Sequence, residues 1–442
     1  MYKKLLFTIS LSFIMWFATA QEVRQMSLQQ AIDYALENNP TIINAKLAEN
    51  IADSRVSENI ATGMPQINGG IDIANNFELP TSFLPGTIVG SPDPEVPIQF
   101  GTRYSGSATL SLSQMIFDGS FFVGLEGAKT YRELSIKDLE KTKIDVAEVV
   151  SKSYYAVLVS EFRLNLINNN YGRLDTLLNE TTEMYKSGFV EKIDVNRSKV
   201  QFNNITVEKA SFEKLLQITR ANLNFQMGLP IEESLILTDK LMEYVFEEEA
   251  DEQFSYSNRI EYSILQTNQQ LAFLDKKLNN VRYLPSVDLY ATVGANLGTG
   301  DASNIFDISN QWYNFGLVGI RMKIPIFDGL QKHYINQQKK LKMEQIGQTF
   351  NQMEKSMDLE IKNSKVKVEN AIALLNTQKE NMEIAKEVYE VTKEKYQAGV
   401  GSNLEVINAD ADYKLAQTNF FIALYNMLIA KVDYKKSIGK LL

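Results

Sequence analysis

The feature that most constrains this chain is an internal duplication. Ile116-Phe117-Asp118-Gly119 recurs as Ile326-Phe327-Asp328-Gly329, 210 residues later. Tyr185-Lys-Ser-Gly188 recurs as Tyr396-Gln-Ala-Gly399, 211 residues later. Landmarks that keep one order at nearly one spacing indicate two copies of a single structural unit. Any fold must therefore be built twice from the same elements.

The two copies define the organisation of the chain. Residues 21–228 form the first copy, residues 258–442 the second, and residues 229–257 a bridge between them. In each copy a helical stretch leads to a proline, Pro65 or Pro285, beyond which the apolar residues change to a period of two. The expected order in each copy is a helix, two strands, a very long helix, a sharp turn and a return helix.

Four segments alternate apolar and polar residues, as strands with one wet face do. They cover about residues 66–79, 102–117, 286–299 and 312–327. Each is about long enough to cross a bilayer as a tilted strand, which takes roughly 9–11 residues. The alternative is a soluble sandwich whose apolar faces cover one another. The residues expected to face lipid include Leu110, Leu112, Leu289 and Val293.

Each Phe-Asp-Gly is followed by a segment that predicts a helix of unusual length. No proline lies between Phe121 and Ser187, and a helix of about 67 residues would span roughly 100 Å. Apolar residues recur every seven positions, which predicts coiled-coil walls rather than binding sites. The expected rungs are Val150, Val157, Leu164, Tyr171, Leu178 and Tyr185, and in the second copy Ile361, Val368, Leu375, Met382, Tyr389 and Tyr396.

Four strands cannot close a barrel, because known barrels begin at about eight strands. A coil of this length is also very large for a compact soluble domain. Several copies of the chain would solve both problems, since together they would close the barrel and arrange the helix pairs into a tube. Two, three or four copies would supply 8, 12 or 16 strands, and the residue pattern leaves that number open.

The first twenty residues predict export. Lys3 and Lys4 precede the apolar run Leu5–Phe17, and Ala18-Thr19-Ala20 follows, which is the order of a secretory signal peptide over residues 1–20. The alternative, a membrane-anchoring helix, would need about 20 apolar residues. No cysteine and a single histidine make a disulfide or a histidine-based site unexpected, and neither a cofactor nor an enzymatic activity is predicted. A formal net charge of −9 argues against nucleic acid as a partner.

With the opening Ser27–Pro40 segment, the duplicated Phe-Asp-Gly and the two Tyr-x-x-Gly turns, the chain resembles the TolC-type outer-membrane efflux proteins over essentially its whole mature length. The resemblance implies a fold that is mainly α with β, in which a homotrimer forms a 12-stranded β-barrel in the outer membrane, continued by a periplasmic α-helical coiled-coil barrel. It also implies a passive exit duct of a tripartite efflux pump or a type I secretion system. The implied partners are a periplasmic adaptor protein, an inner-membrane pump or ABC transporter, and outer-membrane lipid.

In that family the two turns form the periplasmic tip, where the adaptor docks and the tube narrows. The matching turns are residues 185–190 and 396–402, and a plain helix C-cap is the alternative for each. The residues carried over to the docking turns are Tyr185, Gly188, Tyr396, Gly399, Val400 and Gly401. Gly401 stands where some relatives have an arginine that holds the gate shut.

The resemblance also assigns the aperture. The family's narrowest ring uses two carboxylates on the second return helix, and here the positions hold Glu405 and Asn408, so only the first is acidic. Asp194 matches an acid that in relatives can hydrogen-bond the tip tyrosine, here Tyr396. The alternative for Asp194 is a solvated acid in the first turn of a helix.

Two other classes of function are alternatives to an export duct. A structural coiled-coil envelope protein or adhesin would explain the long helices, but it gives no reason for four amphipathic strands. A free-standing porin would explain the strands, but it would need no periplasmic helices of roughly 100 Å.

If Leu110 and Val293 face lipid near the middle of the bilayer, replacing either by arginine should destabilise the folded barrel by roughly 2–4 kcal/mol. The free energy of unfolding of each variant, measured in detergent or lipid against the wild type, checks this expectation. Full tolerance of arginine at both positions would contradict a lipid-facing surface.

Overall fold

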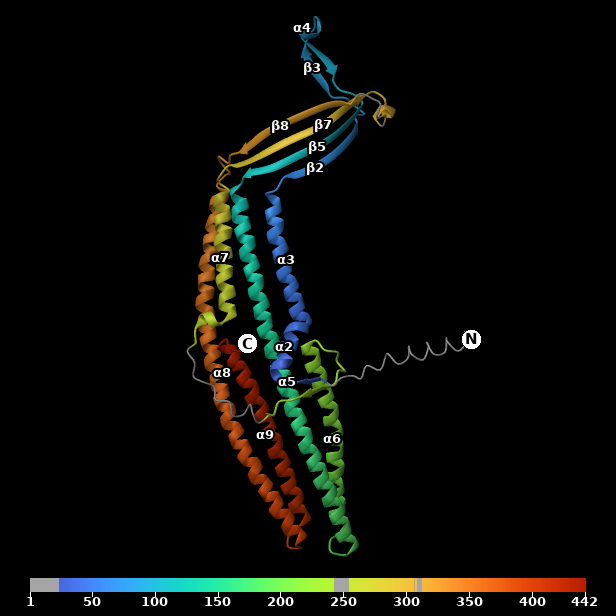
Figure 1. Ribbon diagram of the computed structural model, residues 1–442, viewed down its shortest axis with the longest axis vertical. Helices are drawn as coiled ribbons and strands as arrows, with labels where there is room; N and C mark the ends of the chain where they lie inside the picture. Colours follow the sequence, from blue (N-terminus) through green and yellow to red (C-terminus); the bar gives the residue numbers. More distant parts are fainter. Residues whose placement is uncertain (1–23, 242–253, 306, 308–311) are drawn as a thin grey trace, which may run out of the picture. The chain divides into compact units, whose positions relative to one another are not determined.

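The computed structural model describes residues 24–241, 254–305, 307 and 312–442 (Figure 1). The expected signal peptide, residues 1–20, lies outside the described residues, as does the part of the bridge from 242 to 253. The chain divides into two compact units. Unit 1 comprises residues 1–49, 135–266 and 348–442, and unit 2 comprises residues 50–134 and 267–347.

Along the described part of the chain, seven helices of 11 residues or more and the strands between them follow the order expected for two copies. The helices are α2 (Leu28–Asn38), α3 (Pro40–Thr62), α5 (Gly119–Lys186), α6 (Lys192–Met227), α7 (Ile260–Val281), α8 (Gln331–Gln397) and α9 (Asn403–Ser437). The two very long helices, α5 and α8, have 68 and 67 residues. The predicted helix length is therefore confirmed in both copies.

Local capping fixes where the first helices begin. The hydroxyl of Ser27 accepts a hydrogen bond from the Gln30 backbone N–H, and the Gln30 side chain accepts one from the Ser27 N–H, which is a capping box. Asn39 then separates α2 from α3. Its Oδ1 accepts from the Thr41 N–H at 2.7 Å, with Pro40 at the first helical position. The Asn-Pro pair thus ends one helix and starts the next.

Both Phe-Asp-Gly aspartates hold the start of a long helix, with different geometry. Asp118 directly precedes α5, and its Oδ1 accepts from the Ser120 N–H at 2.7 Å. Asp328 stands three residues before α8 begins, and its Oδ2 accepts from the Lys332 N–H at 3.2 Å. Both carboxylates therefore pair with backbone donors that the first helical turn leaves open.

In unit 2 the four expected strands form one antiparallel sheet in the order β2-β5-β7-β8 (Figure 1). Two of them match their expected bounds closely, β5 (Tyr104–Phe117) and β7 (Ser286–Thr299). The other two are shorter than expected. β2 (Gln66–Asn75) stops before residue 79, and β8 (Tyr313–Lys323) stops before residue 327.

The end of β8 has a physical reason in the sequence. Pro325 lacks a backbone N–H and cannot donate to a strand ladder, so the expected continuation through Ile324 to Phe327 is not paired. Beyond β2, the Asn76 N–H still donates to Arg103 O at 2.7 Å, and Pro80 follows four residues later. Both errors lie where the alternating pattern runs on past the last ladder hydrogen bond.

The register places most apolar residues of β2, β5 and β7, with Val318, Ile320 and Met322 of β8, on one face of the sheet, while Phe315 and Leu317 of β8 lie on the other face. Residues paired directly across antiparallel strands share a face, and Leu110 is paired with Val293. A second row is formed by Ile67, Leu112, Ala291 and Val318. Val318 is 74% and Ile320 68% exposed. No second sheet covers these residues in the part of unit 2 that the structure describes, which argues against the soluble-sandwich alternative.

Two small two-stranded sheets were not expected. The stretch between the first two expected strands contains a hairpin of β3 (Thr81–Pro85) and β4 (Glu95–Gln99) with the single helical turn α4 (Gly86–Val89) between its strands. In unit 1, β1 (Arg24–Met26) pairs in parallel with β6 (Leu235–Leu237) of the bridge. Strands of three to five residues are too short to show a recognisable alternation of apolar and polar residues, and β3 and β4 also contain proline.

The core of unit 1 gathers side chains from α2, α5, α6 and α9 around Tyr154, which is fully buried and donates its hydroxyl to Met26 O at 3.1 Å. Between residues 146 and 159 the buried side chains of α5 point in every direction, so the expected rungs there cannot be told from their neighbours. The same core holds Leu424 and Met427 of α9, both completely buried.

Closer to the tips the expected heptad rungs hold better in the second copy. In α8, Val368, Leu375, Tyr389 and Tyr396 are buried, as predicted, while the expected rungs Ile361 and Met382 are only half-buried. In α5 the buried positions are instead Ile167, Asn170, Leu174, Leu177 and Thr181. Tyr171 and Leu178 are half-buried, with the Tyr171 ring centroid 5.0 Å from that of Phe202 of α6, and Tyr185 is exposed. Equal periodicity in the two copies therefore does not give equal burial.

A ladder of alternating charges joins α5 to α9. Lys436 Nζ lies 2.8 Å from Asp145 and 2.5 Å from Glu148, while Lys152 lies 2.6 Å from both Glu148 and Asp433. Burial alone would raise the pKa of Asp145 and of Glu148, but the lysine hydrogen bonds hold both below their usual values. Burial likewise opposes the charge of Lys436, yet its two carboxylate partners hold its pKa above the usual value.

Among the described residues, no helix is both long enough and apolar enough to cross a membrane.

The charge ladder predicts a pH window. The lowered carboxylate pKa values add stability above about pH 4 that is lost as the pH falls through them, and the raised lysine pKa values add stability lost above about pH 10.5. Lys436→Met should therefore lower the free energy of unfolding by about 1 kcal/mol at pH 7, and by less near pH 3. Unfolding at both pH values measures this. Lys386→Met, which removes an exposed pair with Glu390, is the matched control; equal effects of both variants at pH 7 would contradict it.

Candidate functional site at the helix tips

The two tip turns have the same backbone structure, although 211 residues separate them. The Gly188 N–H donates to Tyr185 O at 3.0 Å and the Phe189 N–H to Met184 O at 2.9 Å. In the second turn the Gly399 N–H donates to Tyr396 O and the Val400 N–H to Lys395 O, both at 3.0 Å. Each is a Schellman motif, which ends a helix with a left-handed residue.

The glycines are required by that motif. Gly188 has φ +79° and Gly399 has φ +77°, a conformation that other residues adopt at a cost. The Tyr-x-x-Gly spacing is therefore explained by the helix C-cap itself and does not by itself indicate docking. Phe189 is 80% and Val400 78% exposed, so both turns present a bare apolar side chain.

Gly401 is held tightly against the end of α8. A side chain at this position would place its Cβ 3.1 Å from the Tyr396 backbone nitrogen and 3.2 Å from the Lys395 carbonyl carbon. The Gly401 N–H donates to Lys395 O at 3.1 Å. The turn therefore leaves little room for the arginine that some relatives have here.

The two tip tyrosines are equivalent in sequence but not in environment. Tyr396 is only 3% exposed, and its hydroxyl donates to Thr181 Oγ1 of α5 at 3.3 Å. Burial raises the pKa of Tyr396, and the nearby carboxylates of Asp194 and Glu180 raise it further. Tyr185 is 42% exposed. Only the second-copy tyrosine joins the two helix pairs within one protomer.

Asp194 does not bond the tip tyrosine in this structure. Its Oδ1 accepts from Arg197 Nη1 at 3.5 Å, one turn along the same helix, and its backbone oxygen accepts from Asn403 Nδ2 at 3.1 Å. The expected hydrogen bond between Asp194 and Tyr396 is thus replaced by the bond to Thr181. Asp194 remains close enough for its charge to act on the Tyr396 hydroxyl.

Glu405 and Asn408 both lie on an open face of α9, just after the helix start at Asn403. The hydroxyl of Ser402 accepts from the Glu405 N–H at 3.3 Å and caps the helix. Both residues belong to a continuous stripe of exposed side chains along α9, whose members are alternately three and four positions apart. Its members, here called the open stripe, are Glu405, Asn408, Asp412, Leu415, Asn419, Ile422 and Asn426.

The open stripe brings in an acid that the sequence comparison with the family missed. Asp412 stands seven residues beyond Glu405, at the same heptad position and on the same face, about 10.5 Å further along the helix axis. The signal was available, because heptad counting from Glu405 reaches Asp412 directly. The second carboxylate absent at Asn408 is therefore present one turn higher.

The opposite face of α9 carries buried polar residues at the same period, which were also missed. Asn403, Asp410 and Gln417, here called the polar ladder, are 3%, 3% and 5% exposed. Asn403 Nδ2 donates to Ser198 Oγ of α6 at 3.2 Å. Gln417 Oε1 accepts from Asn170 Nδ2 of α5 at 2.9 Å. Each rung therefore connects the second copy to the first.

The middle rung is a buried ion pair. Arg173 Nη2 of α5 lies 3.0 Å from Asp410, whose other oxygen lies 2.9 Å from Lys414. The guanidinium also lies 4.8 and 4.9 Å from the ring centroids of Tyr389 and Tyr413, whose centroids are 6.2 Å apart. Removing one partner of such a pair leaves a buried charge and typically costs about 3–5 kcal/mol.

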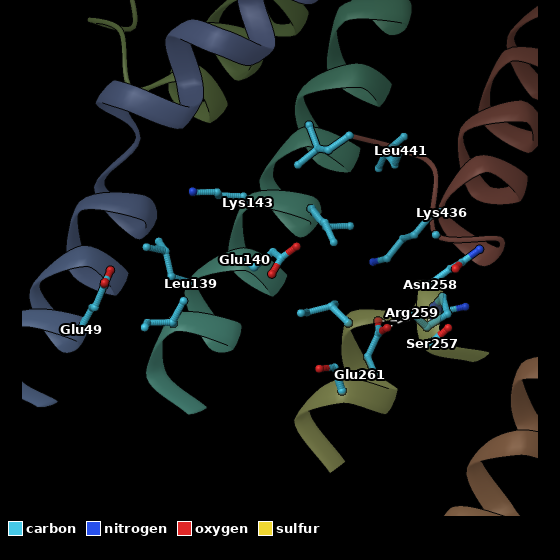
Figure 2. Close-up of a pocket in the computed structure, with 16 residues that line it drawn as sticks. Glu49, Leu139, Glu140, Lys143, Ser257, Asn258, Arg259, Glu261, Lys436 and Leu441 are labelled. Atoms are coloured by element: carbon cyan, nitrogen blue, oxygen red, sulfur yellow. Dashed lines mark hydrogen bonds and ion pairs between the residues drawn. The ribbon is translucent and has the colours of Figure 1, made fainter. Parts of the chain in front are cut away.

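A separate cleft of about 670 Å³ lies in unit 1, lined by α3, α5, the start of α7 and the C-terminal end of α9 (Figure 2). Arg259 at its wall is 6% exposed and is held by Glu261 at 3.0 Å, Glu360 at 3.1 Å and Ser437 O at 2.9 Å. Burial would raise the pKa of Glu261, but the Arg259 hydrogen bond holds it below its usual value. Arg259 and Lys436 are thus engaged in ion pairs and are not free to act on a ligand.

In the ranges that the structure describes, no three His, Cys, Asp or Glu side chains are grouped closely enough to hold a metal ion.

Comparison with known proteins gives a consistent result. The family described as outer membrane efflux protein matches residues 31–229 and 263–440, one segment in each copy. The chain is 20% identical over 422 residues to the outer membrane protein TolC of Vibrio cholerae, covering 94% of this chain and 91% of TolC.

Solved structures agree on the fold. VceC from Vibrio cholerae has a TM-score of 0.68 at 14% identity, over 93% of this chain and 96% of VceC. The open state of the Neisseria gonorrhoeae MtrE outer-membrane channel has a TM-score of 0.72 at 16% identity, over 93% of this chain and 88% of MtrE. Because the family match covers most of the chain in both copies, the chain belongs to the outer membrane efflux protein family.

Proposed function

We propose that three copies of this chain form the outer-membrane exit duct of a tripartite efflux pump or a type I secretion system. The observation that carries the proposal is the sheet of unit 2, which has a bare apolar face and two unpaired edges in a chain of the outer membrane efflux family. Twelve strands from three copies would close the sheet into a barrel, with the apolar face toward lipid and the opposite face, which carries Asp72, Ser107 and Asn296, toward water.

The edges of the sheet support an assembly of several copies. β2 and β8 each have a single neighbour within the described protomer, so each keeps one row of backbone donors and acceptors open. Open edges within a membrane are unstable, because no water is present to satisfy them. Pairing of β8 in one copy with β2 in the next satisfies both rows and repeats around a ring.

The helices support the same arrangement. Several apolar residues of α6 and α8 are bare in the single protomer, although they recur at coiled-coil spacing. On α6 they include Ile193 (49%), Val200 (55%) and Val207 (65%), and on α8 Ile384 (53%), Val388 (50%) and Val391 (44%). Contact between α6 of one copy and α8 of the next would bury both stripes.

The tips are the proposed contact with the periplasmic adaptor, through which an inner-membrane pump or ABC transporter would supply energy. The turns 185–190 and 396–402 fit this role because Phe189 and Val400 are exposed apolar residues on rigid, capped turns. Glu405, Asn408 and Asp412 on the open stripe are the proposed aperture, and Asp194 and Tyr396, which the resemblance also assigns to it, lie behind them on the buried side of the tip. Two carboxylates per copy and no cation on the open stripe make that aperture negative.

Replacing Val200 and Val207 together by glutamate should weaken the assembly, because two charges per copy would be buried between helices. We expect the detergent-extracted trimer of this variant to dissociate at a lower temperature than the wild type. Measuring the mass of the extracted particles across a series of temperatures checks this. Thr206→Glu adds a charge at a neighbouring exposed polar position and serves as the control. Trimers of unchanged stability would contradict the proposed contact.

Glu405→Lys should reverse the charge at the narrowest part of the duct. In planar bilayers we expect the ratio of cation to anion permeability to fall at least severalfold, and block by multivalent cations from the periplasmic side to weaken. Asp412→Asn should produce a smaller shift in the same direction. Glu126→Lys, at an acid near the start of α5 in unit 2, is the control. Ion selectivity that is unchanged in Glu405→Lys would remove Glu405 from the aperture.

A further inference from the structure

The polar ladder lies at a contact where apolar residues would pack more favourably. Asn403, Asp410 and Gln417 occupy buried positions between the two copies, and three of the atoms in these rungs find no hydrogen-bond partner among the described residues. Those atoms are Asn170 Oδ1, Arg173 Nε and Asn403 Oδ1. Buried polar groups that are only partly satisfied cost stability. Their recurrence at one heptad position therefore needs a reason other than stability.

The alanine row of α9 does not define its register. Ala409, Ala416, Ala423 and Ala430 repeat every seven residues, so sliding α9 by one heptad would replace alanine with alanine in that row. The neighbouring buried row, Val406, Tyr413, Phe420 and Met427, differs in size along the helix and favours one register, to which the polar ladder adds. The same slide would place Gln417 beside Arg173 and Asp410 beside Ser198. The guanidinium would then lose its carboxylate. The three rungs differ in chemistry, and this difference makes a single register favourable.

The ladder also determines where the aperture residues stand. Asn403 is the first residue of α9 and bonds Ser198 and the Asp194 backbone oxygen at 3.2 and 3.1 Å. Glu405 and Asn408 follow within two turns, on the opposite face of the same rigid helix. One heptad of slip would move both by about 10.5 Å along the axis, and with them the ring that three copies would form.

We infer that Asn403, Asp410 and Gln417 are positioning residues for the aperture, which with Ser198, Arg173 and Asn170 set the register of α9 on the first copy. The inference rests on the proposed function, because that function assigns the aperture to Glu405. On this inference the two faces of α9 have different roles. The open stripe contacts the transported molecules, and the polar ladder fixes the position of the open stripe along the helix axis.

The first test uses single-channel recording in bilayers. In a variant with Asn170→Leu, Arg173→Leu, Asp410→Leu and Gln417→Leu, the trimer should melt at the same or a higher temperature, because apolar pairs replace buried polar ones. Its conductance should spread over several levels instead of one. In an otherwise wild-type chain, exchanging the two residues of the outer rung, Asn170→Gln with Gln417→Asn, keeps the chemistry of the pair. This variant should therefore keep a single conductance level. Glu161→Leu with Arg220→Leu, an exposed ion pair between α5 and α6, is the control.

A wild type that forms no pore would count against the proposed function. A wild type that conducts, beside a leucine variant with the same single level, would overturn the ladder's role.

The second test reads the register directly and does not depend on conduction. The chain has no cysteine, so engineered pairs can be bridged selectively with a short reagent that reacts with two thiols. Ser198→Cys with Asn403→Cys reports the observed register, and Ser198→Cys with Asp410→Cys reports a slip of one heptad. We expect the first pair to react and the second not. Adding Asn170→Leu, Arg173→Leu and Gln417→Leu should raise the slip product at least tenfold, and a slip product that stays absent would overturn the inference.

Discussion

The structure depends on a sheet that one chain cannot complete. Four strands place most of their apolar residues on one face, where Val318 and Ile320 remain largely exposed, and the sheet ends at two strands with unpaired backbone groups. An apolar face needs a non-aqueous environment, and an open edge needs another strand. In the proposed assembly, lipid and a second copy would satisfy these needs at the same time. The proposed assembly is therefore a consequence of the sheet.

The duplication gives the chain two tips with the same caps and different neighbours. Both turns are Schellman motifs with a left-handed glycine, because a long helix that reverses sharply needs its last carbonyls satisfied. Tyr396 is nevertheless buried against Thr181 while Tyr185 is exposed. The second copy packs on the first within one protomer. In the proposed ring, this asymmetry would distinguish contacts within a protomer from contacts between protomers.

On α9 a single seven-residue period serves two surfaces. The open stripe presents Glu405 and Asp412 to solvent, and the polar ladder holds Asp410 against Arg173 on the opposite side. A helix of this length is rigid enough to transmit position from one face to the other. The chemistry of the buried face can therefore determine where the charges of the open face stand.

The sequence by itself determined the duplication, the lengths of α5 and α8, the four strands with their apolar faces, and the positive φ of Gly188 and Gly399. These follow from local rules, since period, proline position and helix capping act within a few residues. Glu405 and Asn408 were placed on α9 by resemblance to the family, and Asp412 could have been found by counting heptads. Only the tertiary structure decided which rungs are buried, that Tyr396 bonds Thr181 rather than Asp194, and that Arg173 meets Asp410. Those contacts join residues more than 200 positions apart, and periodicity gives the direction of a side chain along its own helix without specifying the neighbour that lies there.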